Sequence, residues 1–431
     1  MKKLVTHCEE YGRLSRRSFL SGSLVSASAF ILGNAIVSLP SWLPRVSLAD
    51  PHVGPRGDTL VVVFLRGGAD GLNIIVPHGD DEYYRRRPTI GIPRPDQAGA
   101  DGALDLDGFF GLHPTLAPLL EIYQAGDLGI VHATGSPDET RSHFEAQDLM
   151  ERGAIEGGDY SGWLARHLTS LDTGNGSALR AIGVGDMLPA ALTGAISGTA
   201  LKSIAEYHLE GRDERIGEMQ ALLAAFYNEK DDLLAAAANQ TLASMEIMTS
   251  IDTGRPPAGR PYPQNDFGNA MQTVAHLLHA DVGVEVATID VGGWDTHVAQ
   301  GSSEGQMANN IGQLGEGLAA FYEDLGPLQD KVSVVVMSEF GRRLQENGGL
   351  GTDHGHGNMM MLLGGGINGG RVHAAWPGLQ PDQLVGPGDL AITTDYRDVL
   401  GELIRVRLNN PMVDEVFPGY AVTDHGLVVP R

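Results

Sequence analysis

The sequence predicts an α/β fold in which a doubly wound, mostly parallel sheet has helices on both faces and carries a helical insertion. Residues 59–65 (TLVVVFL) form a continuous apolar, β-branched run, which is typical of a strand buried on both faces. Glycine-rich segments follow such runs, and helical patterns lie between them. This alternation of strands and helices is typical of parallel sheets.

Four further apolar runs are predicted to be strands of the same sheet, at residues 128–133, 284–291, 332–337 and 359–363. Helical patterns are predicted at residues 115–124, 140–152, 307–325 and 396–408. Residues 200–280 differ, because they are rich in Ala, Leu, Met and Glu and contain no clear strand. We therefore expect one domain over residues 50–431, with a mostly helical insertion near residues 200–280.

Residues 1–49 have the three parts of a signal peptide. Basic residues lead into SRRSFL at residues 15–20, residues 18–43 hold no charge, and the small residues Ser47 and Ala49 precede Asp50. The paired arginines followed by Phe-Leu are similar to the address read by the Tat translocase. We expect a cleaved Tat signal and a periplasmic or secreted protein, with the translocase as its partner during export. An uncleaved anchor is the alternative, since the run is long enough to span a bilayer.

The cysteine and charge content agree with this expectation. Cys8 is the only cysteine and lies inside the predicted signal, so the exported protein would have no thiol and no disulfide. Tat cargo folds before export, and such cargo often acquires a metal or cofactor first. The formal net charge of −24 argues against nucleic acid as a partner.

Carboxylates and imidazoles follow the predicted strands, where ligands bind in open parallel sheets. The candidate metal ligands are Asp70, Asp295, His297, Glu339, Asp353, His354 and His356. Asp295 and His297 stand two residues apart, which puts both side chains on one side of an extended loop. Asp353, His354 and His356 share a glycine-rich loop that could wrap an ion. Their oxygen and nitrogen atoms suit a divalent metal such as zinc, manganese, calcium or magnesium. A second ion about 3.5–4 Å away would suit displacement at phosphorus or sulfur.

Structural roles compete with several of these assignments. Asp70 follows two glycines and could be an N-cap or turn residue. Glu339 could pair with Arg342 or Arg343 on a surface turn. His113 precedes a proline and is interpreted as a structural histidine rather than a ligand.

Six stretches resemble the DUF1501 family of bacterial, mostly Tat-exported proteins, which is similar to a distant branch of the alkaline phosphatase and sulfatase superfamily. The stretches are FLRGGADGLNIIVP, LHPTLAPLLEIYQAGDLGIVHATG, TRSHFEAQDLMERG, VGGWDTH, VVVMSEFGRRLQENGGLGTDHGHGN and TTDYRDVLGEL. They are spread over residues 59–408, which is nearly the whole chain after the predicted signal.

This resemblance implies an alkaline phosphatase-like α/β domain and assigns roles within it. Asp70 resembles the carboxylate that holds metal after the first strand, and Asp295 and His297 resemble the ligands of one ion. Ser142 lies where the superfamily keeps its nucleophile, at a helix N-terminus whose amides can hold an anion. His143, beside it, is a rival catalytic residue.

The sequence also departs from the superfamily pattern. Glu339 stands where relatives have Asp, and Phe340 follows it in place of the usual His or Asn. Thr140 is a further rival for the nucleophile. Ser136 and Pro137 do not reproduce the sulfatase signature, and the exported chain has no Cys, which argues against a formylglycine sulfatase.

The expected function is an exported, metal-dependent hydrolase of phosphate or sulfate esters in a small molecule or a polymer. The alternative is a non-catalytic exported binding or assembly partner in an envelope or extracellular polymer system, together with a second exported protein. An oxidoreductase accessory is a weaker option, because the sequence has no dinucleotide, haem or iron–sulfur motif to support it.

Overall fold

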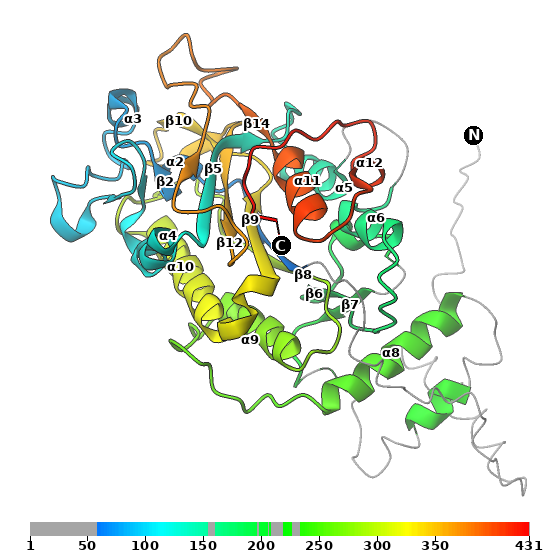
Figure 1. Cartoon of the computed structure of the whole chain (residues 1–431). Coiled ribbons are helices and arrows are strands. Elements are labelled where there is room, and N and C mark those ends of the chain that lie inside the picture. Colours follow the sequence, from blue (N-terminus) through cyan, green and yellow to red (C-terminus); the bar gives the residue numbers. More distant parts are fainter. Residues whose placement is uncertain are drawn as a thin grey trace, which may run out of the picture. The chain divides into compact units, whose positions relative to one another are not determined.

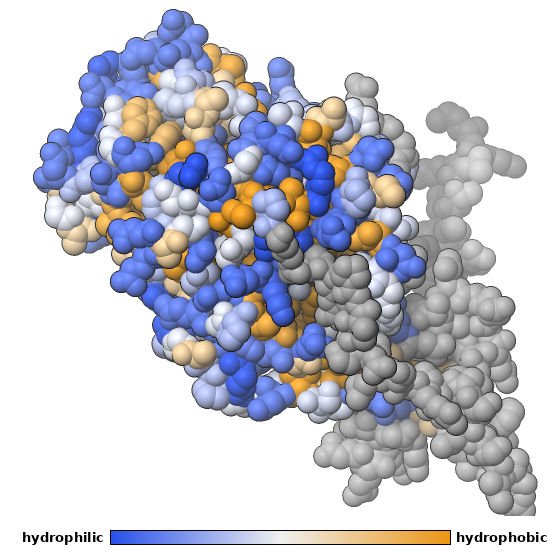
Figure 2. Space-filling model, viewed as in Figure 1, coloured by the Kyte–Doolittle hydropathy of each residue, from blue (hydrophilic) through white to orange (hydrophobic). Residues whose placement is uncertain are grey.

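A computed structural model describes residues 58–153, 160–195, 198–205, 207, 219–225 and 233–430. The predicted signal peptide, residues 1–49, lies outside these residues. Among the helices that are described, none combines the length and the apolar composition needed to cross a bilayer. On the face shown in Figure 2, hydrophilic residues predominate and hydrophobic residues form patches between them.

The centre of the fold is a nine-stranded sheet with the strand order β13-β5-β12-β9-β1-β8-β6-β7, and β14 also pairs with β5 (Figure 1). The strands are β1 (Thr59–Leu65), β5 (Leu128–Gly135), β6 (Ala181–Val184), β7 (Gly198–Leu201), β8 (Val286–Val291), β9 (Val332–Ser338), β12 (Asn358–Leu363), β13 (Val372–His373) and β14 (Thr394–Asp395). The pairs are parallel except those of β12, which runs antiparallel to both β5 and β9. The predicted mostly parallel sheet is confirmed, and the strand predicted at residues 359–363 is its antiparallel member.

Helices cover both faces of this sheet, as predicted. One face packs against η3 (Pro114–Leu119), α4 (Leu120–Ala125), α9 (Asp266–His279) and α10 (Gln306–Leu325). The other packs against α5 (His143–Arg152), α6 (Trp163–Ser170), α11 (Tyr396–Val406) and α12 (Val413–Val416). In β1, Val61 and Val63 belong to the first core, whereas Leu60 and Val62 belong to the second. Because side chains alternate along a strand, one unbroken apolar run supplies both cores.

The described part of residues 200–280 is largely helical and contributes to the main core. It includes α8 (Leu233–Thr249) and α9. Met271 of α9 and Met248 of α8 are buried in the core on the first face of the sheet. The hydroxyl groups of Ser244 in α8 and Thr199 in β7 lie 3.3 Å apart, within hydrogen-bond distance. Helix α9 is therefore one of the helices that cover the sheet.

Shorter elements surround the sheet. They are α2 (Gly71–Ile74), β2 (Ile75–Val76), α3 (Asp81–Arg86), η2 (Gly99–Asp101), β3 (Leu104–Asp105), β4 (Gly111–Leu112), η4 (Ala190–Leu192), η5 (Gly326–Lys331), β10 (Arg342–Glu346) and β11 (Thr352–His354). Strands β10 and β11 form an antiparallel hairpin in which Arg342 is the register partner of His354. This hairpin connects β9 to β12.

The direction of β12 decides which loops meet at one edge of the sheet. Strands β1, β5, β8 and β9 are mutually aligned, so their carboxyl ends lie at the same edge. Because β12 is antiparallel, its amino end, at Asn358, lies at this edge. The loop before β12 therefore joins the loops that follow the parallel strands.

A candidate histidine and aspartate metal site

Three histidines gather around one carboxylate oxygen at this edge. Oδ1 of Asp295 lies 3.0 Å from Nε2 of His297, 3.3 Å from Nε2 of His354 and 3.4 Å from Nε2 of His143. The two nitrogens Nε2 of His297 and His354 are 2.9 Å apart. The donor atoms of His143, Asp295 and His354 all lie within 4.8 Å of one another, an arrangement that could hold a metal ion. We call these four residues the histidine cluster.

Each part of the chain that supplies the histidine cluster reaches it from a different strand. His143 is the first residue of α5, which follows β5, and Ser142 is its N-cap. Asp295 and His297 lie in the loop after β8, and His354 ends β11, before β12. Gly67, after β1, lies so close to this loop that a Cβ there would stand 2.7 Å from the Asp295 amide nitrogen. Close packing of the strand-end loops therefore requires glycine at this position.

The Nδ1 atoms of two histidines are held by acceptors outside the cluster. Nδ1 of His354 donates to the carbonyl oxygen of Arg141 at 2.8 Å, because a carbonyl can only accept. Nδ1 of His143 lies 2.8 Å from Oε1 of Glu339 and donates to this carboxylate. In the neutral tautomers that result, Nε2 of both rings carries a lone pair toward the cluster. Nε2 of His143 is buried and has no hydrogen-bond partner. Metal-binding histidines are oriented by acceptors in this way.

Glu339 orients His143 rather than joining the donor atoms of the cluster. Its carboxylate is buried and also accepts from the Gly67 amide at 2.9 Å, from Gln147 at 2.8 Å and from the Ser338 hydroxyl at 3.0 Å. Burial raises the pKa of Glu339, but these donors outweigh burial and leave the pKa below its usual value. The carboxylate is thus ionised at neutral pH and fixes the His143 ring.

Asp295 is held as a carboxylate by a buried arginine. Nη2 of Arg342 lies 2.6 Å from Oδ1 of Asp295, and the Arg342 side chain is completely buried. Burial alone raises the pKa of Asp295, but the hydrogen bond and charge of Arg342, with the nearby His354, lower it to about 2. Arg342 therefore pairs with Asp295, and not with Glu339 as one sequence interpretation had it.

Two other predicted ligands, Asp353 and His356, are not among the donor atoms that group together in the histidine cluster. Oδ1 of Asp353 lies 3.7 Å from Nδ1 of His297 and accepts from Nδ2 of Asn347 at 3.0 Å. Asn347 also donates to the His297 carbonyl at 3.0 Å, so it connects the two loops. The hydrogen bond from Asn347 lowers the pKa of Asp353. His356 is half-buried, and burial lowers its pKa, but it is not among the grouped donor atoms.

The structure does not bring Asp70 to the histidine cluster. Asp70 and Arg87 are both completely buried, and Oδ2 of Asp70 lies 2.6 Å from Nη1 of Arg87. Gln300 donates to the same oxygen at 2.7 Å. Asp70 precedes α2 as its N-cap residue, but its side chain accepts no capping hydrogen bond. It is one half of a buried ion pair.

Positive groups border the loop that carries His143. Ser142 is exposed and its side chain makes no capping hydrogen bond, so its hydroxyl is open to solvent beside the first turn of α5. The amides of that turn have no helical acceptor and carry partial positive charge. Arg141 pairs with the buried Asp389, which Nε of Arg343 approaches at 3.9 Å. An anionic group at this loop would meet a helix N-terminus and arginine side chains.

The sequence predicted most residues of the histidine cluster but not which of them contact one another. Asp295, His297 and His354 were predicted as ligands, whereas His143 was predicted only as a catalytic residue. The contact between Arg342 and Asp295 was missed, since no local pattern connects residues in separate loops. Phe340 packs against the rings of His143 and His354, with centroid separations of 4.9 Å in both cases. Its place in the sequence, directly after Glu339, was the available signal.

Two of the distances within the cluster match those between the ligands of a tetrahedral ion. Ligands about 2.0–2.1 Å from a tetrahedral centre are roughly 3.3–3.4 Å from one another. The separations from Asp295 to His354 and to His143 are 3.3 Å and 3.4 Å. Nε2 of His297 is closer to Asp295, at 3.0 Å, but His297 is not one of the three residues whose donor atoms group together. The residues present therefore fit a single divalent ion.

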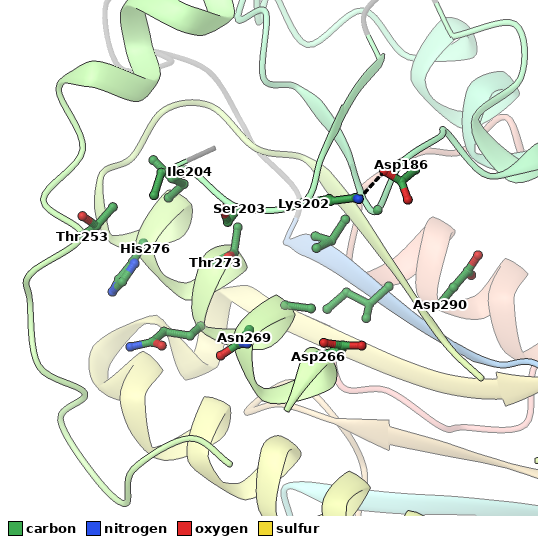
Figure 3. Close-up of a pocket in the computed structure, with 16 residues that line it drawn as sticks. Asp186, Lys202, Ser203, Ile204, Thr253, Asp266, Asn269, Thr273, His276 and Asp290 are labelled. Carbon is green, nitrogen blue, oxygen red and sulfur yellow. Dashed lines mark ion pairs between the residues drawn. The ribbon is translucent and has the colours of Figure 1, made fainter. Parts of the chain in front are cut away.

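A separate cavity of about 710 Å³ opens beside α9 (Figure 3). Its walls come from α9, from the segments that follow β6 and β7, and from Ile289 and Asp290 at the end of β8. Lys202 and Asp186 form an ion pair of 2.7 Å at this cavity. His276 lines it and is buried, with no hydrogen-bond partner for Nε2. No residue of the histidine cluster lines the cavity, so the two are distinct.

Comparisons with known proteins bear on the family and not on the chemistry. A family model described as "Protein of unknown function (DUF1501)" matches residues 113–401. No curated protein matches the chain. Among solved structures, the chain is similar to one described as "Crystal structure of PsFucS1 sulfatase from Pseudoalteromonas sp.", with 12% sequence identity and a TM-score of 0.38. The match covers 93% of this chain and 81% of that one. A similarity at this level says nothing about activity, substrate or cofactor.

Proposed function

The chain belongs to the DUF1501 family, and from this premise and the geometry of its histidine cluster we propose that it is an exported, metal-dependent hydrolase of phosphate or sulfate esters. The observation that carries the proposal is the arrangement of His143, His354 and Asp295. Their donor atoms face one point, and both histidine rings are fixed from behind by acceptors. The buried, unpartnered Nε2 of His143 is the kind of atom that a bound cation would satisfy.

The donor set favours zinc or manganese among the divalent ions. Imidazole nitrogen with one carboxylate oxygen suits these metals, whereas calcium and magnesium prefer oxygen ligands in larger number. A bound divalent ion supplies Lewis acidity and stabilises negative charge that develops on the transferring group. Glu339 and the Arg141 carbonyl keep His143 and His354 aimed at the site.

The surroundings of the cluster favour an anionic substrate group. The open amides of α5 would attract the charged oxygens of a phosphate or sulfate ester. Arg141 and Arg343 border the same loop, where both lie against the carboxylate of Asp389. Ser142 carries an exposed hydroxyl at this helix N-terminus and is the nearest candidate nucleophile along the chain. The substrate would be either a small-molecule or a polymer ester. The Tat-like segment at residues 1–49 supports a reaction in the periplasm or outside the cell.

Metal content and activity test the proposal together. Full-length protein purified without chelator is expected to contain about one equivalent of zinc or manganese and to hydrolyse p-nitrophenyl phosphate or p-nitrophenyl sulfate. His354→Ala should lose both properties. His373→Ala is the matched control, because His373 is a half-buried histidine whose ring also contacts one backbone carbonyl, that of Asn368. A chain with no bound divalent ion, or an activity that survives in His354→Ala, would contradict the proposal.

The alternative is a protein that binds the metal ion but catalyses no reaction. In that case the exported chain binds an ion for structure and acts as an assembly partner of a second exported protein. The same experiment separates the two, since full metal occupancy with no hydrolysis of any phosphate or sulfate ester would favour assembly. Co-purification of a stoichiometric partner that persists in His354→Ala would then support it.

A further inference from the structure

Arg342 is bound by the chain in the way that a metal ion would be. Its guanidinium donates to the carbonyl oxygens of Gly67, Gly68, Trp294 and Thr352, and to Oδ1 of Asp295. Four neutral carbonyls and one carboxylate, contributed by the loops after β1 and β8 and by β11, surround one buried positive charge. A hard cation is held by the same kinds of oxygen.

The Arg342 guanidinium and the three histidines of the cluster contact the same carboxylate oxygen, Oδ1 of Asp295. Oδ1 of Asp295 faces Nη2 of Arg342 at 2.6 Å and faces the three histidine nitrogens at 3.0–3.4 Å. In two-metal sites the ions lie about 3.5–4 Å apart and share ligands of this kind. From these contacts we infer that Arg342 is a fixed cation in the place of a second metal ion, so that the site takes one ion only. The inference rests on the proposed metal-binding function.

With Arg342 in place, its guanidinium already uses the five oxygens that could hold a second ion. Oδ2 of Asp70, the carboxylate after β1, is bound by Arg87 and Gln300, and its buried Oδ1 has no hydrogen-bond partner. Phe340 fills the space over the histidine rings, and a Cβ on Gly68 would stand only 2.5 Å from its ring. Like-charge repulsion from a buried guanidinium further disfavours a divalent ion at this position.

The direct test is the number of ions bound. Metal-free full-length protein is titrated with Mn²⁺, the bound metal is counted after gel filtration, and the electron paramagnetic resonance spectrum is recorded. We expect one equivalent and an uncoupled Mn²⁺ spectrum in the wild type. Arg342→Ala exposes the five oxygens to a new occupant, so we expect it to bind a second equivalent of Mn²⁺ with a spin-coupled spectrum.

Arg407→Ala is the matched control. Arg407 is also buried and also donates to one carboxylate, Asp58, and to two backbone carbonyls, Val429 and Asp330. This variant should remain at one equivalent, which separates loss of a buried guanidinium from loss of this particular one. Arg342→Gln keeps most of the side-chain length and removes the charge, and it replaces Arg342→Ala where the latter does not fold.

The outcomes are distinguishable. Two coupled ions in the wild type overturn this inference and leave the proposed metal-binding function standing. One ion in the wild type and in both Arg342 variants also overturns it, since the guanidinium would then exclude nothing. No ion in the wild type overturns the proposed function and this inference together.

Discussion

Nε2 of His297 lies 2.9 Å from Nε2 of His354. Because Nδ1 of His354 donates to the Arg141 carbonyl, a neutral His354 presents a lone pair to His297. Two lone pairs facing each other at this distance would repel. Either His297 carries a proton on Nε2, or both nitrogens bind the same cation from one side. The relationship links the protonation of the cluster to its occupancy by metal.

Metal binding should therefore weaken in acid. An imidazole binds a metal ion through a nitrogen that carries no proton, so a histidine ligand that takes up a second proton must lose it before the ion binds. Burial lowers the pKa of His354, so this ligand should compete with protons only below about pH 6.5. Chelator competition at pH 7 and pH 5 measures the change in affinity, and an affinity that is the same at both values would count against the relationship.

Asp70 should stabilise the fold, whereas Asp295 should bind metal. Asp70→Asn leaves the buried Arg87 without its counter-charge, so we expect the free energy of unfolding to fall by about 3 kcal/mol. Metal affinity should change little. Asp295→Asn should weaken metal binding more than about 100-fold, because it removes a ligand and not only a supporting contact. Urea unfolding and chelator competition measure the two quantities. Loss of metal in Asp70→Asn with full binding in Asp295→Asn would reverse these assignments.

Glu339 should act on the metal through His143. Glu339→Gln retains the shape of the side chain but loses the charge that holds Nδ1 of His143. We expect metal affinity to fall by about 10–100-fold, the range for contacts that orient a ligand. Glu145→Gln is the control, since Glu145 lies in the same helix and bonds to Thr140 instead of a ligand. Equal affinities for the two variants would rule out this positioning role.

Buried histidines should make the fold sensitive to acid. Burial lowers the pKa of His113, His132 and His167 to about 4 in each case. The unfolded chain binds these protons near pH 6.5, whereas the folded chain binds them only near pH 4. Stability should therefore be unaffected by them above pH 6.5 and should fall as the pH drops toward 4. The expected slope is roughly 1.4 kcal/mol per pH unit for each histidine.

His132 offers a direct check of this slope. Its Nε2 donates to the Ile75 carbonyl, and its Nδ1 accepts from the Ala133 amide, so the neutral ring is fully bonded. A second proton would break the bond from Ala133. Urea unfolding between pH 7 and pH 4.5 measures how the free energy of unfolding changes with pH. For His132→Gln this slope should be smaller by roughly 1.4 kcal/mol per pH unit, the contribution of one histidine. An unchanged slope would mean that His132 does not titrate as its burial implies.

Much of the fold could be predicted because its signals are local. The unbroken apolar run at residues 59–65 is strand β1, since burial on both faces demands such a run. The pattern at residues 307–325 became α10 (Gln306–Leu325) with a difference of one residue. Strands β6 and β7 were missed because each is four residues long and contains Ala and Gly, which give no clear strand pattern.

The sequence by itself determined the fold class, the family and the set of polar residues at the strand ends, because these follow from composition and order along the chain. Only the tertiary structure decided how those residues pair. Strand β12 is antiparallel, so His354 lies at the same edge of the sheet as His143. Asp70 pairs with Arg87, and Asp295 pairs with Arg342. A buried carboxylate needs a positive partner, and which arginine supplies it depends on loops that meet only in the folded chain.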